Sequence, residues 1–381
     1  MTGQSSRGPA LATLRESLAP HQVVQDEHER AEPVEPDAGT SGQTSMPPEP
    51  PPSVTEPDPV LPGWPPGVPN QPVHVGDTTR LSSSFRAIAD MPRSTGWRRW
   101  LRMGPSRSQI AAAQRKARLL TSFPEPLTLA CMSVKGSAGK TTVMRGLTAA
   151  LAKNRGGGVV FVDVNELRGT AGLRSVLTHG RHIGDVLARS DYLLGQHAQV
   201  SEVEWCMNRQ PDSSEWVLVS DPTTTVPMAE KEFYHLHTIL KRFYSIIGFD
   251  TGNAELATSW KAVARSTDLV VVPMKWRADH IEPAAKMLAA MLGRGEQLVG
   301  RVVIVGTNNK DEADPLARKQ AYEHFEGLPI LEIPVDPGLN EQVIRWNNLR
   351  PVTQVAFEEL GAVLLDMAQE KIRSRDGQSL R

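Results

Sequence analysis

A run of eight residues combines the residue types that can hold a chain of phosphates. In order, these residues are Lys135, Gly136, Ser137, Ala138, Gly139, Lys140, Thr141 and Thr142. Glycines let backbone N–H groups turn toward an anion, a lysine meets the β- and γ-phosphates, and a hydroxyl group reaches Mg²⁺. The run therefore predicts a phosphate-binding loop. A dinucleotide-binding turn is excluded, because the GxGxxG pattern does not occur here.

The elements that must position this loop alternate along the chain from residue 127 onward. Apolar runs of strand length cover 127–134, 158–164, 216–220, 244–250, 268–274, 301–306 and 328–334. Helical stretches between them include 140–154, 229–243, 279–292 and 315–325. Continuous runs of Val, Ile and Leu are typical of a parallel sheet that is covered on both faces. We therefore predict an α/β fold with a doubly wound, mostly parallel sheet and ligand loops after the first, second and fourth runs.

The 30 prolines divide the chain into regions, because 16 of them fall within residues 1–72. A stretch with so few aromatic and β-branched residues cannot bury enough apolar surface to offset the entropy of ordering it. We predict a disordered, acidic, Pro-rich leader over residues 1–78. One folded domain is expected over 123–372, followed by a flexible tail over 373–381.

The net charge of -1 is the sum of two opposed segments. Residues 1–60 carry ten acidic residues against three arginines, whereas residues 80–118 carry ten basic residues against Asp90 alone. Tryptophans and arginines alternate in the linker at 79–122, which also has a helix-forming stretch. Such a segment is typical of a basic surface for DNA, a membrane or a partner protein. A strap packed on the folded domain is the alternative.

The cysteines and the N-terminus bear on the compartment. Cys131 and Cys206 are too few for a disulfide framework and lack CxxC spacing. No apolar run reaches about 18 residues, and the first residues lack the charged and apolar regions of a secretion signal. We predict a cytoplasmic protein, with the inner face of the cell membrane as an additional peripheral location.

The last periodic stretch, residues 355–372, has an apolar stripe of Phe357, Leu360, Leu364 and Met367. The stripe suits packing on the sheet. Membrane contact is the alternative, but four acidic residues of this stretch would face anionic lipid. We therefore expect the stripe to lie in the core.

Two positions separate the loop from an ordinary phosphate-binding loop. Val134 stands where a glycine is usual, and a second lysine, Lys135, opens the loop. The loop resembles the deviant Walker A motif, KGGxGK[ST], of the MinD/ParA family of P-loop ATPases, and the resemblance spans about residues 125–350. It implies ATP and Mg²⁺ as cofactors, with Gly136 to Thr142 around the phosphates. It also implies an ATP-dependent homodimer, in which Lys140 acts in its own subunit and Lys135 reaches the partner subunit's phosphates.

The resemblance extends to the metal site. The segment FVDVN at 161–165 looks like the family's second-strand segment, whose aspartate, here Asp163, assists water activation and magnesium. The segment IGFDTG at 247–252 looks like its switch, with Asp250 as a carboxylate for Mg²⁺. Together with Thr141, these residues form the implied metal set. For each aspartate taken alone, the alternative is a carboxylate that caps the turn after a strand.

The resemblance also implies a wall for the adenine base. Asn308, or its neighbour Asn309, follows the run 301–306 where the family has its adenine-contacting asparagine. Pro334 and Asp336 resemble the family's closing Pro-x-Asp segment beside the base.

Three positions depart from the family pattern. Ser137 replaces the second glycine of the loop, and a serine tolerates fewer backbone conformations. Gly252 stands in place of the usual proline of the switch. Asn165 occupies the position of a second aspartate in MinD itself, and a neutral amide cannot act as a base. These departures predict slow ATP hydrolysis.

The arrangement of the whole chain resembles a narrower group. An acidic Pro-rich leader, the segment GWRRWL at 96–101, GPS at 104–106 and NELRGT at 165–170 are similar to the EspI-like ATPases associated with type VII (ESX) secretion in actinobacteria. The implied function is an ATP-dependent switch that regulates or positions a partner assembly, with a type VII component as the protein partner. The alternatives are a partition-type ATPase that binds DNA through residues 80–118 and a metabolic enzyme that activates a carboxylate with ATP.

Overall fold

The computed structural model describes residues 106–165, 169–223, 227–294, 300–307 and 314–379. The predicted leader at 1–78 and most of the basic linker lie outside this range. Asn308 and Asn309 also lie outside it.

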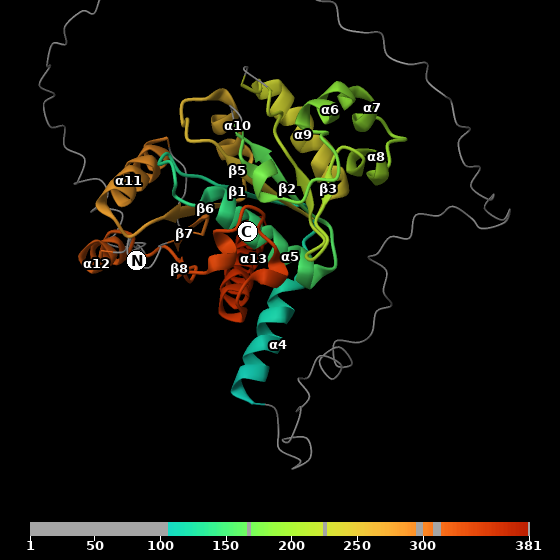
Figure 1. Cartoon of the computed structure of the whole chain (residues 1–381). Coiled ribbons are helices and arrows are strands. Elements are labelled where there is room, and N and C mark those ends of the chain that lie inside the picture. The colour runs from blue at the N-terminus through green and yellow to red at the C-terminus, as the bar shows by residue number, and fades with distance from the viewer. Residues whose placement is uncertain (1–105, 166–168, 224–226, 295–299, 308–313, 380–381) are drawn as a thin grey trace, which may run out of the picture. The chain divides into compact units, whose positions relative to one another are not determined.

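A sheet of eight strands runs through the described part of the chain (Figure 1). Its order is β3-β4-β2-β5-β1-β6-β7-β8. The strands are β1 (Leu127–Cys131), β2 (Val159–Val164), β3 (Asn208–Arg209), β4 (Trp216–Leu218), β5 (Ile246–Thr251), β6 (Leu269–Met274), β7 (Val302–Gly306) and β8 (Ile330–Glu332). Every neighbouring pair is parallel except β3 and β4. The predicted doubly wound, mostly parallel sheet is confirmed.

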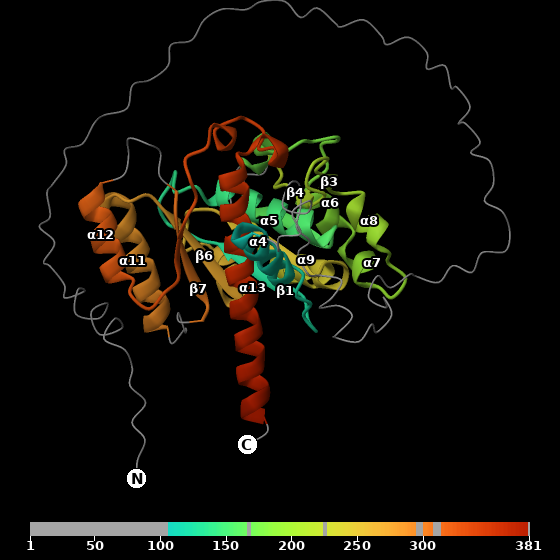
Figure 2. The ribbon, with the colours of Figure 1, turned by 90° about the horizontal axis from the view of Figure 1, so that it is seen from below.

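Helices cover both faces of this sheet (Figure 2). The α-helices are α4 (Arg107–Leu119), α5 (Lys140–Arg155), α6 (Ile183–Ala188), α7 (Ser190–Leu194), α8 (Val200–Glu204), α9 (Glu230–Phe243), α10 (Thr258–Ser266), α11 (Ala278–Gly293), α12 (Pro315–His324) and α13 (Pro351–Ser379). Short 3₁₀ helices are η1 (Ala171–Arg174), η2 (Pro337–Leu339) and η3 (Trp346–Asn348). Side chains of α9, α10 and α11 share one core with the sheet, whereas α5 and α13 share the other.

The second core brings α13 against the helix that follows the predicted phosphate loop. Phe357 and Leu360 of α13 are fully buried. At Gly146 of α5 there is no room for a side chain, because a Cβ atom would lie 2.2 Å from the Phe357 ring. The apolar stripe predicted at 355–372 is therefore buried, as expected. Its main partners are α5 and α4, and it makes fewer contacts with the sheet itself.

Helix α4 is the described part of the basic linker, and it packs along α13 and α5. Arg115 Nε lies 2.8 Å from a carboxylate oxygen of Glu358. Arg118 contacts both Glu359 and Asp366 at 2.7 Å. The acidic residues of α13 thus pair with basic residues of α4, which favours the strap interpretation for this helix.

Some element boundaries differ from the sequence prediction. Strand β3 was not predicted, since two polar residues carry no apolar pattern. Helix α13 continues to Ser379, past the boundary predicted at residue 372. Because α4 packs on α13, the folded unit also includes residues before 123. No helix in the described ranges combines the length and apolar character needed to cross a membrane.

Candidate nucleotide-binding site

The predicted phosphate loop joins β1 to α5 at the carboxyl edge of the sheet. Gly139 caps α5 with a left-handed backbone at φ 91°, and a Cβ atom there would lie 3.3 Å from the Thr307 side chain. Thr307 Oγ1 donates a hydrogen bond of 2.8 Å to the Ala138 carbonyl oxygen. Ser137 also has a positive φ, 61°, a conformation that is uncommon for residues other than glycine. The loop thus keeps its turn although serine replaces the second glycine.

The two loop residues that start α5 point toward β5 and the segment after it. The Lys140 ammonium group donates to the Asn253 side-chain oxygen. Thr141 Oγ1 donates to Asp250 Oδ2 at 2.5 Å. The structure therefore places Thr141 and Asp250, both predicted metal ligands, in direct contact.

The two predicted aspartates lie side by side at the ends of adjacent strands. Asp163 of β2 and Asp250 of β5 are register partners, and both are almost completely buried. Burial, and then the neighbouring charge of Asp163, raise the pKa of Asp250 to about 8. Asp250 Oδ1 has no hydrogen-bond partner among the described residues. A buried carboxylate oxygen without a donor, beside a threonine hydroxyl, fits the oxygen ligands that Mg²⁺ requires.

Asp163 is engaged by the turn that follows its strand. Its Oδ1 accepts the Asn165 backbone N–H at 3.1 Å. Its Oδ2 accepts the Ala171 N–H and the Ser220 hydroxyl, both at 3.2 Å. Asp163 thus caps this turn, as the structural alternative for this residue predicted. The capping contacts do not use all the lone pairs of the carboxylate, so a further role is compatible with them.

A cavity of about 240 Å³ opens beside Asp163 and Asn165. Its other walls include Asp221 and Glu232 and the apolar side chains of Ile183, Leu187 and Met228. An aspartate at position 165 would line the same cavity as Asp163, but the neutral Asn165 occupies that position.

A second cavity of about 240 Å³ adjoins the loop on its other side. It is lined by Ser137, Gly139, Thr142, Val143, Arg174, Lys275, Thr307, Ile333, Pro334, Val335, Asp336, Leu339 and Asn340. Pro334 and Asp336, predicted beside the adenine base, therefore share a cavity with the phosphate loop. The Asp336 oxygens accept the backbone N–H groups of Gly338 at 2.9 Å and Arg350 at 2.8 Å, so Asp336 also shapes the wall.

Lys135, which opens the loop, points away from these cavities toward α11. Its ammonium nitrogen lies 3.2 Å from Asp279 Oδ2, and both side chains are exposed. Hydrogen bonds from Arg277 and then Lys135 lower the pKa of Asp279 to about 2. The lysine is thus held by a surface carboxylate of its own subunit.

Three residues of the loop cavity were not identified in the sequence. Arg174 and Lys275 bring positive charge to its walls, and Thr307 holds the loop carbonyl. Arg174 ends the short 3₁₀ helix η1, and Lys275 and Thr307 follow strands, so no repeated spacing marks any of the three. The sequence prediction also missed Asn253, which accepts from Lys140.

The raised pKa of Asp250 predicts a pH-dependent cost of folding in the absence of metal. The folded state binds the Asp250 proton more tightly than the unfolded state does. Protonation of Asp250 therefore stabilises the fold fully below about pH 4, and this contribution is lost as pH rises toward 8. We expect Asp250→Asn to be more stable than the parent, by a margin that grows from pH 5 to pH 8. Urea denaturation without nucleotide measures this margin. Asp191→Asn, at an exposed position, is the control, and an equal margin at both pH values would contradict the assignment.

A mostly parallel sheet covered on both faces, with a glycine-containing loop between its central strand β1 and helix α5, defines an α/β fold of the P-loop type. No family model matches the chain. Two curated relatives, both named ESX-1 secretion-associated protein EspI, come from Mycobacterium tuberculosis strains CDC 1551 / Oshkosh and ATCC 25618 / H37Rv. Each is 24% identical over 242 residues, which are 61% of this chain and 35% of the relative. The chain therefore spans about 35% of the length of these relatives.

One similar solved structure is a ParA family ATPase from Chlorobium tepidum TLS. It is 18% identical to this chain, and the TM-score is 0.49. The match covers 64% of this chain and 98% of that chain. Another is the septum site-determining protein MinD complexed with Mg-ADP from Pyrococcus horikoshii OT3. It shows 17% identity, 62% and 94% coverage, and a TM-score of 0.47. The curated match confirms the resemblance to EspI-like proteins.

Proposed function

We propose that the chain binds ATP with Mg²⁺ at the loop 135–142, hydrolyses it slowly and dimerises on ATP to regulate a partner assembly. The observation that carries this proposal is the contact of Thr141 with Asp250, whose second carboxylate oxygen is buried without a donor. A cation-binding carboxylate next to a phosphate loop suits a metal-nucleotide complex better than a free anion.

The residues divide the work of binding by their positions. Lys140 and the N–H groups at the start of α5 would meet the β- and γ-phosphates, while Thr141, Asp250 and Asp163 would hold the metal. When bound, Mg²⁺ would neutralise part of the negative charge that develops during phosphoryl transfer. Pro334 and Asp336 line the cavity that would receive the nucleoside. Asn308 is part of this proposal, although it lies outside the described residues.

Slow hydrolysis is supported by the groups around Asp163. Three donors occupy its oxygens, and Asn165 beside it is neutral at every relevant pH. Asp163 would then orient or deprotonate the attacking water without help from a carboxylate at position 165. Such a rate suits a switch whose two states must persist long enough to meet a partner.

We expect Asp163→Ala to bind ATP but to hydrolyse it at least about tenfold more slowly, because it removes the group that activates water. Asn165→Asp should raise turnover or leave it unchanged. Single-turnover phosphate release measures all three proteins. Asp163→Asn serves as a second variant, since it keeps one acceptor oxygen for the capped turn. If both Asp163 variants release phosphate as fast as the parent, Asp163 only caps the turn and does not activate water.

Dimerisation is proposed from the resemblance of Lys135 to the lysine that reaches a partner's phosphates. Its present partner, Asp279, is exposed, and exposed ion pairs are weak and easily exchanged. We expect Lys135→Ala to bind ATP as a monomer, whereas Asp279→Asn still dimerises because it only frees the lysine. Light scattering with ATP, ADP and no nucleotide gives the mass of each state. An ATP-dependent dimer of Lys135→Ala would contradict the sandwich arrangement.

The partner assembly is proposed from the EspI relatives, whose name associates them with ESX-1 secretion. We therefore propose a type VII secretion component as the protein partner. The alternative is DNA binding through residues 80–118. It is less favoured because Arg115 and Arg118 are paired with acidic residues of α13. A salt titration decides between them, since tight DNA binding that falls steeply with salt would support partition.

A further inference from the structure

Arg174 spans the cavity between the phosphate loop and the wall proposed for the nucleoside. It ends η1, and its Nη2 donates to Thr142 Oγ1 at 3.2 Å and to the Leu339 carbonyl oxygen at 2.5 Å. Thr142 lies in the first turn of α5, whereas Leu339 belongs to η2, next to Asp336. The guanidinium group thus bridges α5 and η2, and both of its contacts, Thr142 and Leu339, line this cavity.

The charge of this guanidinium group is not matched by a carboxylate. Both of its hydrogen-bond acceptors are neutral oxygens, and no ion pair with Arg174 is formed within the described ranges. Asp336, the acidic residue in the cavity wall, already accepts two backbone N–H groups. A half-buried arginine with neutral acceptors can gain strongly from an anion, because charge-assisted and bidentate hydrogen bonds are the strong ones.

We propose that Arg174 binds the α-phosphate, the phosphate nearest the nucleoside, and that Gln210 is the positioning residue that holds the segment of Arg174. The inference rests on the proposed binding of ATP at this site. Thr141 and Lys140 face Asp250 and Asn253, on the metal side of the loop, whereas Thr142 and Arg174 face the nucleoside side. A cation on the nucleoside side would meet the α-phosphate before it met the γ-phosphate.

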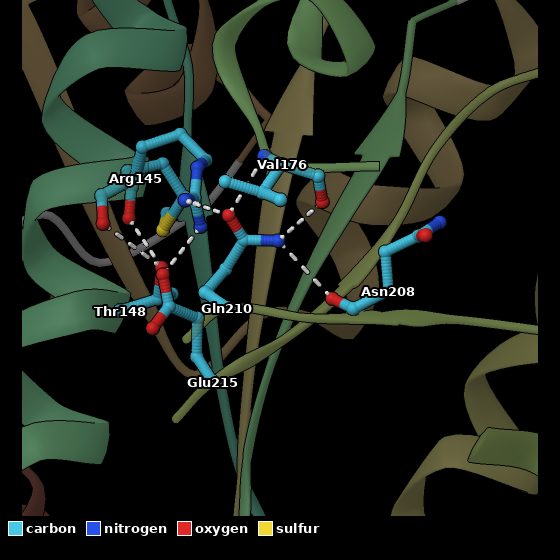
Figure 3. Close-up of polar contacts among 7 residues, drawn as sticks. Arg145, Thr148, Val176, Asn208, Gln210 and Glu215 are labelled. Carbon is cyan, nitrogen blue, oxygen red and sulfur yellow. Dashed lines mark hydrogen bonds and ion pairs between the residues drawn. The ribbon is translucent and has the colours of Figure 1, made fainter. Parts of the chain in front are cut away.

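The holding contacts form a buried network shown in Figure 3. Gln210 Oε1 accepts the Val176 N–H at 3.0 Å, and its Nε2 donates to the Val176 carbonyl oxygen at 3.0 Å. The amide thus fixes both backbone groups of the residue that lies two positions after Arg174. The same Nε2 donates to the Asn208 carbonyl oxygen at 3.2 Å, within the β3–β4 hairpin.

The network is tied in turn to the helix that carries the phosphate loop. Arg145 of α5 donates through Nη2 to Gln210 Oε1 at 3.3 Å and through Nη1 to Glu215 Oε1 at 2.6 Å (Figure 3). The segment of Arg174 and the second turn of α5 are therefore anchored to one common hairpin. This arrangement fixes the guanidinium group relative to the loop, which precise placement of a phosphate contact requires.

The test uses the full chain and the two diastereomers of adenosine 5′-O-(1-thiodiphosphate), which differ only in the α-phosphate oxygen that sulfur replaces. We expect the parent to prefer one diastereomer. Arg174→Gln should lose about tenfold or more in affinity for both ATP and ADP and should lose this preference. Arg174→Lys should retain part of the affinity, because it keeps the charge without the planar fork. Arg209→Gln, an exposed arginine beside Gln210, is the matched control and should bind as the parent does.

Gln210→Glu tests the positioning role with a side chain of the same size. It keeps an acceptor for the Val176 N–H but loses the donor to the carbonyl oxygens of Val176 and Asn208. We expect a few-fold loss of ADP affinity and a weaker diastereomer preference, both measured below the melting temperature, which should fall because a buried carboxylate here faces two carbonyl oxygens. An unchanged preference in this variant would leave Gln210 with a structural role only.

The outcomes separate this inference from the proposed function. A parent that binds neither ATP nor ADP would overturn the proposed function and this inference together. If the parent binds ADP but Arg174→Gln stays within about twofold of it, only the role of Arg174 is overturned. A loss for ATP without a loss for ADP would move the contact to the γ-phosphate. Equal affinity of the parent for both diastereomers, or a preference that survives in Arg174→Gln, would overturn the α-phosphate assignment.

Discussion

Lys140→Ala is expected to bind ATP at least about 100-fold more weakly than the parent. Lys140 is the first residue of α5, and its ammonium group donates to Asn253, just after the strand β5 whose Asp250 accepts from Thr141. A phosphate chain at this loop would receive its strongest charge-assisted hydrogen bonds from this group, and about 2.7 kcal/mol corresponds to a factor of 100. Titration with a fluorescent ATP analogue measures the change.

Lys153→Ala provides the matched control for this prediction. Lys153 lies in the last turn of the same helix, and its ammonium group donates to the Asp212 carbonyl oxygen, away from the loop. Its removal should leave ATP affinity unchanged. If Lys140→Ala retains micromolar affinity for ATP, the loop is not the binding site.

Glu215→Ala is expected to lower the free energy of unfolding by about 3–5 kcal/mol, because it leaves the Arg145 charge buried without a partner. The exposed fraction of the Arg145 side chain is 2%, and that of Glu215 is 0%. The guanidinium group would keep Gln210 Oε1 as a neutral acceptor and the face of Phe161 at 5.4 Å. Neither can replace a carboxylate at 2.6 Å. Urea denaturation followed by circular dichroism gives the difference.

Two further variants identify the cause of this loss. The double variant Arg145→Met with Glu215→Leu should recover most of the stability, since apolar side chains of similar size remove both buried charges. Lys286→Ala breaks an exposed pair with Glu282 and should change stability very little. A loss below about 1 kcal/mol in Glu215→Ala, or a double variant as unstable as the single one, would contradict the role of the buried pair.

Much of the fold could be predicted because its main strands are continuous apolar runs separated by helices. Strand β3 (Asn208–Arg209) could not, since its residues are polar and its pairing depends on the turn that leads to β4. The short helices between β2 and β4 also lack enough turns to show a periodic pattern. From the sequence alone, the basic residues of α4 predict a contact surface for another molecule. The fold instead places acidic residues of α13 beside them.

The candidate site also contains residues that the sequence predicts and residues that it does not. The loop and the two aspartates adjoin strand ends, so their positions in the sequence predict that they meet at one edge of the sheet. Arg174 lies in an irregular segment whose path depends on Gln210, more than 30 residues away in sequence. Arg145 is the one charged residue in the buried middle of α5, residues 143–152, and its partner Glu215 is 70 residues distant. Such long-range pairs carry no local pattern.

The measurement that tests the central claim most directly is a calorimetric titration of ATP into the intact chain, with Mg²⁺ and with EDTA. The orphaned oxygen of Asp250 and the adjacent loop predict saturable binding of one ATP per chain in micromolar concentrations of ligand, clearly weakened by EDTA. Absence of saturation up to millimolar ATP, or an affinity that EDTA leaves unchanged, would contradict a magnesium-nucleotide site at this loop.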